Sequence, residues 1–115
     1  MMKEIGGNIT GIIQVKSGSI KNDIGETIPN WTNAITLNGF LDYSNGDSKY
    51  LPYSTKVEES THVFIADYQE LPQVIKTDNS RMIIKGKKYD ILLIDNPMEM
   101  NYHFEIYLKY NGDLQ

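Results

Sequence analysis

Two histidines and nearby carboxylates are the side chains of this sequence whose types and spacing could do chemistry. The stretch NYHFEIYLKY places His103, Glu105 and Lys109 at alternating positions, and His62 lies with Asp67 in the stretch THVFIADY. An imidazole beside a carboxylate could bind a metal ion or act as an acid–base pair. A small hydrolase or metal enzyme would need both rings close together in a pocket. Because the spacings match no known motif, we expect each imidazole on the polar face of a strand or paired across a sheet.

Short clusters of oxygen donors are a second possible site for a cation. Residues 95–97 (Asp-Asn-Pro) and 78–80 (Asp-Asn-Ser) could ligate calcium, but these residue types also form turns by bonding to nearby backbone. The sequence contains no Gly-x-Ser-x-Gly, no glycine-rich phosphate loop and no His-Glu-x-x-His motif. We therefore expect no catalytic residue, no metal site and no cofactor, and a protein that is not an enzyme.

Three lysines, Lys85, Lys87 and Lys88, cluster around Gly86. Their ammonium groups could contact phosphate, although lysines at a hairpin tip commonly serve solubility. The formal net charge of −4 should repel a nucleic-acid backbone on average. An OB-like module that binds single-stranded nucleic acid is the alternative function, and it requires aromatic rings beside this turn that stack on bases.

Length and composition limit the possible classes of protein. We expect a single domain over residues 1–115, since this length allows one hydrophobic core. The absence of Cys excludes a disulfide framework and fits a reducing compartment. Without a signal core or a membrane-length apolar run, we expect a soluble intracellular product with no membrane partner. Eight tyrosines favour strands and wet protein interfaces.

Apolar residues alternate with polar ones along much of the chain, and a helical period is hard to find. This pattern predicts an all-β fold, a small antiparallel β-barrel of about six strands, because closure removes the exposed edges of a small sheet. The expected strands are Asn8–Lys16, Trp31–Tyr43, Thr61–Tyr68, Met82–Ile84, Tyr89–Ile94 and Asn101–Tyr110. The second contains Asn38-Gly39, which we interpret as a bulge or a tight turn.

The two faces of the last expected strand differ in polarity. One face should point into the core and consists of Tyr102, Phe104, Ile106 and Leu108. The other is a possible subunit interface and consists of His103, Glu105, Tyr107 and Lys109. Further apolar anchors are expected in the connector that follows the third strand, namely Leu71, Val74 and Ile75.

Two polar segments lack regular apolar spacing and are expected to be loops on a rigid β body. Ser17–Glu26 is read as a loop or a mobile arm, and Ser44–Ser60 as a long loop projecting between the middle strands. Residues 111–115 form a polar tail. Long loops without secondary structure are uncommon in compact domains and are usually functional or disordered. Binding or assembly is therefore the expected role of this chain.

Four groups of residues, taken in order, carry a resemblance to a known family. The turn at residues 23–27 (DIGET) precedes Trp31 and a long strand, and residues 61–65 (THVFI) follow a polar excursion. Residues 81–91 (RMIIKGKKYDI) form a hairpin motif, and residues 103–108 (HFEIYL) form a final strand. Their order and spacing resemble the head-closure, or stopper, proteins of long-tailed bacteriophages, the head-tail joining family, which includes relatives encoded by prophages.

The resemblance implies a structural virion protein that is made in the bacterial host cytoplasm and resides at the head–tail interface. It implies a monomer in isolation and a homo-oligomeric ring in the virion, in contact with portal, adaptor and tail-completion proteins. The ring would seal the portal channel, retain packaged DNA and provide the tail docking surface, while passing DNA without specific binding. By position, the channel-closing loop would consist of Ser44, Asn45, Gly46, Asp47, Ser48, Lys49, Tyr50, Leu51, Pro52, Tyr53, Ser54, Thr55 and Lys56.

Overall fold

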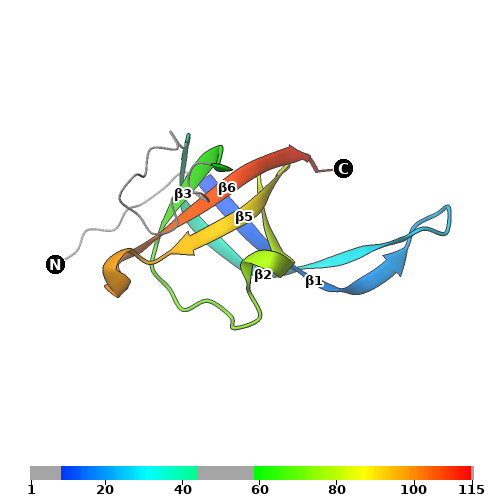
Figure 1. Cartoon of the computed structure of the whole chain (residues 1–115), viewed down its shortest axis with the longest axis horizontal. Helices are drawn as coiled ribbons and strands as arrows, with labels where there is room; N and C mark the ends of the chain where they lie inside the picture. Colours follow the sequence, from blue (N-terminus) through cyan, green and yellow to red (C-terminus); the bar gives the residue numbers. More distant parts are fainter. Residues whose placement is uncertain (1–8, 44–58, 115) are drawn as a thin grey trace.

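Six antiparallel strands account for most of the residues that the structure describes. The computed structural model describes residues 9–43 and 59–114. The strands are β1 (Ile9–Lys21), β2 (Thr27–Tyr43), β3 (His62–Asp67), β4 (Ser80–Ile84), β5 (Lys87–Asp95) and β6 (His103–Asp113) (Figure 1). Two single 3-10 turns, η1 (Thr77–Asn79) and η2 (Pro97–Glu99), precede β4 and β6. Within the described ranges, no helix is long and apolar enough to cross a membrane.

Each of the six strands pairs with two neighbours, so that the hydrogen-bonded order β1-β2-β3-β6-β5-β4 closes on itself. The closing seam pairs Gly11 to Val15 of β1 with Ile84 to Ser80 of β4. All six pairings are antiparallel. The expected all-β fold with six antiparallel strands is therefore confirmed. Pairing on both sides leaves no strand of this body with a wholly unpaired edge.

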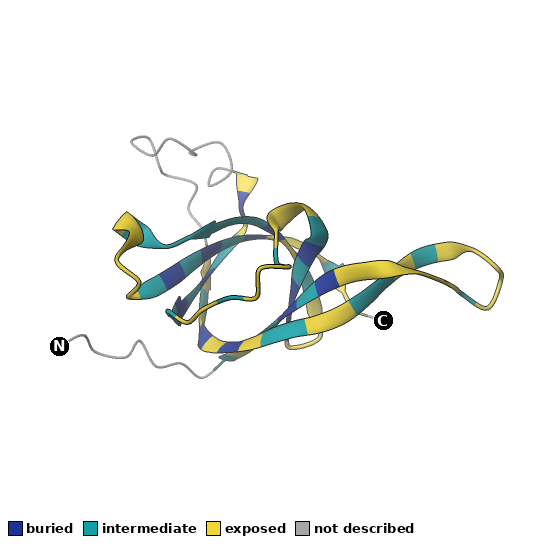
Figure 2. Ribbon diagram, turned by 90° about the horizontal axis from the view of Figure 1, so that it is seen from below, coloured by how far each residue is buried: buried dark blue, intermediate teal, exposed yellow. Residues whose placement is uncertain are grey.

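The core lies inside the closed sheet, and every strand contributes at least one buried apolar side chain. These inward residues include Ile13, Leu37, Phe64, Met82, Ile91 and Ile106. Figure 2 shows the buried segments on the strands of the body, in contrast to the hairpin that projects from it. In β6, Phe104, Ile106 and Leu108 are buried as expected, because alternate residues of a strand point to the same face.

Two residues that were expected in the core lie at the surface instead. Tyr102 is 50% exposed because it lies in a bend before β6 begins, where strand alternation does not apply. Its carbonyl accepts a hydrogen bond from the backbone N–H of Tyr68 at 3.2 Å. Val74 is 52% exposed, so only Leu71 and Ile75 of the three expected anchors pack against the core.

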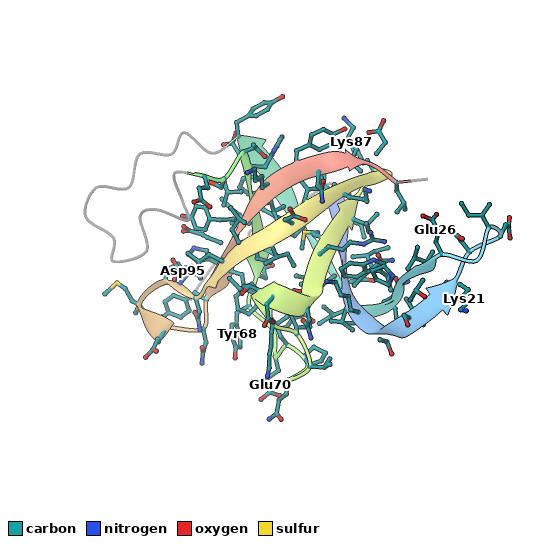
Figure 3. All side chains as sticks on the ribbon, turned by 45° about the vertical axis from the view of Figure 1, so that its right-hand side comes forward. Lys21, Glu26, Tyr68, Glu70, Lys87 and Asp95 are labelled. Atoms are coloured by element: carbon teal, nitrogen blue, oxygen red, sulfur yellow. The ribbon has the colours of Figure 1, made fainter. Side chains whose placement is uncertain are left out.

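Half of the segment Ser17–Glu26, expected to be a loop or a mobile arm, is strand: residues 17–21 belong to β1, and residues 22–26 form the turn that leads into β2. Beyond the body, β1 and β2 continue as a two-stranded arm, residues 17–30, in which Ile20 lies opposite Ile28. Figure 1 shows this arm extending away from the closed sheet, and Figure 3 shows Lys21 and Glu26 on it, clear of the body. The sequence pattern misses the strand pairing of the arm because a two-stranded ribbon with no buried face needs no apolar alternation.

Side-chain contacts hold the arm at its tip and at its base. At the tip, Asn22 Oδ1 accepts hydrogen bonds from the backbone N–H groups of Ile24 at 3.2 Å and Glu26 at 2.9 Å. At the base, the guanidinium of Arg81 lies 4.2 Å from the ring centroid of Trp31. A cation–π contact of this kind contributes about 0.5–2 kcal/mol. It links the point where the arm leaves the body to β4.

Gly39 lies where β2 approaches the backbone of β3 most closely. It pairs with Ala66, and a Cβ atom at this position would lie 2.1 Å from the carbonyl oxygen of Ile65 and 3.1 Å from Phe64 Cζ. β2 continues through this position without a register shift, so its interpretation as a bulge or a tight turn is wrong. The glycine is needed because no side chain fits between the two strands.

We expect Gly39→Ala to lower the free energy of unfolding by about 1–3 kcal/mol or more, because β3 must move to admit the methyl group. The measurement is urea unfolding followed by the fluorescence of Trp31, the sole tryptophan. Asn38→Ala is the matched control. The exposed Asn38 side chain accepts one hydrogen bond, from the Thr10 hydroxyl at 3.1 Å, so its loss should cost about 1 kcal/mol or less. A Gly39→Ala variant as stable as the wild type would contradict the close approach of the two strands.

Candidate functional site

The outer face of β6 brings together three of the four residues expected to form a subunit interface. His103 Nε2 lies 3.1 Å from Glu105 Oε2, and the Tyr107 hydroxyl donates to Glu105 Oε1 at 2.9 Å. Lys109 is exposed and lies opposite Asp90 of β5. The side chains of His103 and Glu105 are 30% and 31% exposed. They form a short polar row that solvent, and thus a polar partner, can reach.

Apolar side chains from β2 and β3 extend this face. In the β3–β6 ladder Val63 lies opposite Tyr107 and Ile65 lies opposite Glu105, while Phe40 of β2 lies opposite Ile65 on the other side. We call Phe40, Val63, Ile65, Glu105 and Tyr107 the outer patch. Phe40 is 38% exposed. Sequence reasoning missed the three apolar members. The unbroken apolar run at residues 63–66 was a signal for two of them, because successive residues of a strand point to opposite faces and some of this run must therefore point outward.

The two histidines lie at opposite ends of the β3–β6 pair and on opposite faces of the sheet. His62 begins β3 and lies opposite Leu108, whereas His103 begins β6 and lies opposite Asp67 at the end of β3. The strand from residue 62 to residue 67 spans about 17 Å. The shared metal or acid–base site considered for these two rings is therefore not formed. Within residues 9–43 and 59–114, no group of three or more His, Asp or Glu side chains gathers where it could hold a metal ion.

His62 instead joins a cluster of aromatic rings at the end of the body where β2 ends and β3 begins. Its ring centroid lies 4.9 Å from that of Tyr43 and 5.2 Å from that of Tyr89. The Tyr89 ring lies 5.7 Å from that of Tyr110, and Lys87 Nζ lies 6.0 Å from the Tyr110 centroid. We call Tyr43, His62, Tyr89 and Tyr110 the aromatic cluster. These rings come from four different strands, so only the register of the sheet brings them together.

A pocket of about 340 Å³ opens beside the aromatic cluster. Its walls are apolar (Ile9, Leu41, Ile84), aromatic (Tyr43, His62, Tyr89) and charged (Asp42, Lys85, Lys87). Figure 3 shows Lys87 at the opposite end of β5 from Asp95, so the pocket lies at one end of the closed sheet. Its volume falls near the lower end of the range of about 300–1,000 Å³ that is typical of small-molecule sites.

Lys85 and Gly86 form the two-residue turn that joins β4 to β5, with Ile84 opposite Lys87. The turn is therefore shorter than the gap between the expected strands Met82–Ile84 and Tyr89–Ile94, because β5 begins at Lys87. Both turn residues have positive φ angles, 51° and 76°, as a type I′ turn requires. Asn or Gly is favoured at the first position, since a left-handed conformation costs other residues about 1–2 kcal/mol. Lys85 is thus held in a strained conformation at the wall of the pocket.

The environment of His62 favours its neutral form. Burial, and secondly the Lys87 ammonium, lower the pKa of its imidazole. The Thr61 hydroxyl oxygen lies 2.8 Å from His62 Nδ1 and accepts a hydrogen bond from the backbone N–H of Tyr110 at 2.8 Å. Thr61 therefore orients the ring. A neutral, oriented imidazole lines the pocket without adding positive charge.

The expected channel-closing loop, residues 44–56, lies outside the described residues. The strands that flank it are described, and Tyr43 at the end of β2 lies opposite His62 at the start of β3. The connection between these strands therefore starts and returns at one end of the sheet, beside the aromatic cluster.

No protein-family model matches the sequence, and no curated protein matches it either. The resemblance to head-closure proteins stays a prediction. The case for a function therefore depends on the residues and the geometry given above.

We expect the fold to lose stability as the pH falls past the ordinary histidine pKa of about 6.5. Below that pH the unfolded chain takes up a proton that folded His62 resists, and the loss grows until the pH reaches the lowered pKa of the folded state. His62→Gln removes this contribution. Its melting temperature should therefore fall less than that of the wild type between about pH 7.5 and about pH 5. Parallel melting curves for the two proteins across this range would contradict the expectation.

Proposed function

We propose that this chain is a structural subunit of a phage head–tail connector, a head-closure (stopper) protein that seals the portal channel and offers the tail a docking surface. The observation that carries the proposal is the closed six-stranded sheet whose middle strands, β2 and β3, are joined by the polar residues 44–56. In this proposal the sheet is a small β-barrel body and residues 44–56 are the closing loop. The order of sequence motifs that resembles the head-closure family supports the same role.

The attachment of the proposed loop suits a gate. Tyr43 and His62 are direct cross-strand neighbours, so both ends of the connection are held by one rigid sheet. A segment anchored at two adjacent points of a rigid scaffold changes its path without disturbing the strands beneath it. Retention of DNA and its later release would then require motion of the loop alone.

Ring assembly requires two different surfaces on each subunit, because a cyclic contact is heterologous. We assign one of them to the outer patch, whose apolar side chains on β2 and β3 lie beside the polar row on β6, a mixture of apolar and polar groups that is typical of a non-obligate interface. We assign the other to the arm, where Ile20 and Ile24 are 49% and 79% exposed without a core beneath them. The outer patch of one subunit would contact the arm of the next.

A loop-deletion variant tests the gate. We expect replacement of residues 44–56 by a short Gly/Ser linker to preserve the fold, because the two ends are already neighbours in the sheet. Complemented into a phage that lacks the gene, the variant should give heads that assemble and contain the subunit but lose their DNA. The measurement is the DNA content of purified heads, with Asn38→Ala as a folded surface control that retains DNA. Heads that carry the loop variant and hold DNA normally would disprove the closing role.

A charge in the outer patch tests the subunit contact. Phe40→Glu should leave the monomer folded, because this side chain is 38% exposed, but should weaken assembly about thirty-fold, or about 2 kcal/mol. The measurement is the amount of subunit that cosediments with heads. Thr36→Glu is the matched control. Thr36 is exposed on the same face of β2, but it lies in the part of β2 that pairs with β1 and not with β3. Equal incorporation of both variants would remove the outer patch from the interface.

One observation favours the alternative, an OB-like module that binds single-stranded nucleic acid. Aromatic rings do lie beside the basic turn, because Tyr89 and Tyr110 pack near Lys87. A single-strand binder, however, stacks successive bases along a basic groove. Here the rings gather around one pocket at the end of the sheet. The arrangement could therefore bind one base but has no groove along which several bases could stack. The connector role remains our proposal.

A further inference from the structure

The pocket at the end of the sheet presents an unused aromatic surface. Tyr43 is 79% exposed, and the His62 ring packs against the Tyr43 ring with centroids 4.9 Å apart and an interplanar angle of 36°. His62 also packs against Tyr89, which is 3% exposed, in a T-shaped arrangement with centroids 5.2 Å apart. A buried tyrosine and an oriented histidine thus support a tyrosine that faces solvent. A planar heteroaromatic ring could stack at this supported surface.

The charge around the pocket is opposite in sign to that of the whole chain. Two ammonium groups, Lys85 and Lys87, and one carboxylate, Asp42, line it, whereas the chain carries a net charge of −4. Among the described residues, neither lysine forms an ion pair. The Asp42 carboxylate is already engaged, since Oδ1 accepts a hydrogen bond from the backbone N–H of Tyr43 at 2.8 Å. Two lysines and one carboxylate leave the lining with a net positive charge, which favours an anionic group such as phosphate.

The conformation of Lys85 is a third observation at the same wall. Its φ of 51° places it at the turn position where Asn or Gly is favoured. Strained residues of this kind concentrate where a side chain has a functional role. Lys85 belongs to the pocket and has no partner within the described part of the chain that would account for a lysine here.

We propose that this pocket binds a nucleotide, with its base stacked at Tyr43 and its phosphate held between Lys85 and Lys87. The volume of about 340 Å³ suits one nucleotide rather than several. The ligand could be a free nucleotide or the phosphorylated end of a strand, which share this chemistry. The proposal does not depend on the connector role, since it uses only the rings and charges of the described pocket.

The test is a titration of the full chain, followed through the backbone amide signals in NMR spectra. The probes are deoxyadenosine monophosphate, deoxyadenosine, inorganic phosphate, and a short single strand with a 5′ phosphate. We expect the nucleotide to bind about ten-fold or more tightly than either the nucleoside or phosphate, because only it engages both the ring and the cations. The signals of Tyr43, His62 and Lys87 should shift. A strand whose effects stay within these residues identifies the strand end as a source, and a strand without effect identifies the free nucleotide.

Two variants separate the parts of the site. Lys85→Asn places the favoured residue in the type I′ turn, so its melting temperature should equal or exceed that of the wild type while nucleotide affinity falls about ten-fold. Tyr43→Ala should weaken binding of both nucleotide and nucleoside by about five-fold or more and leave phosphate unaffected. Lys88→Gln is the matched control, since Lys88 is the neighbouring lysine and does not line the pocket.

Three results would overturn the proposal. The first is the absence of any shift in the pocket with the nucleotide at millimolar concentration. The second is wild-type affinity in a folded Lys85→Asn variant. The third is a set of shifts that spreads along the outer faces of several strands, which would indicate an extended single-strand binder. Each of these results tests the nucleotide pocket alone, whereas the DNA content of heads that carry the loop-deletion variant tests the connector role.

Discussion

Closure of the sheet between β1 and β4 is the constraint on which the interior depends. At Gly11, which lies in this seam, a Cβ atom would be 3.0 Å from Met82 Sδ and 3.3 Å from Phe64 Cζ. Met82 and Phe64 are both fully buried and come from strands that do not pair with each other. Both side chains lie over a position where β1 has no side chain. A larger residue at that point would compete with both for the centre of the core, because interiors of this kind have no spare volume.

Closure of the sheet also determines which parts of β1 and β2 project from the body. β1 and β2 have 13 and 17 residues, more than any other strand, and the excess length has no partner in the body. It becomes the arm, whose backbone is paired but whose side chains have no core. The arm is therefore held by its ladder, by the Asn22 turn and by the contact of Arg81 with Trp31. Such an element adds little to stability and presents much surface, as a binding element does.

Residue order predicted the body of this protein well, and for a physical reason. Strands that line a core must alternate, so Phe104, Ile106 and Leu108 were placed correctly and six strands were found. The strand pairing within the arm was missed because a two-stranded ribbon without a buried face does not require regular apolar spacing. Gly39 was misinterpreted because the reason for a glycine at this position is the close approach of the Ile65 carbonyl, which belongs to a strand distant in sequence. The aromatic cluster was missed for the same reason, since its rings are neighbours only through the register of β2, β3, β5 and β6.

The pocket is lined by the two residues that flank the connection proposed as a gate. Tyr43 is the last residue of β2 and His62 the first of β3, so the rings at the pocket are also the ends from which the connection of these strands departs. A ligand stacked on Tyr43 would add contacts at that point. If its affinity differs between two paths of the connection, the ligand must shift their populations by that same difference. Occupancy of the pocket would then bias the proposed gate, and a ligand with equal affinity for both paths would leave the proposed gate unchanged.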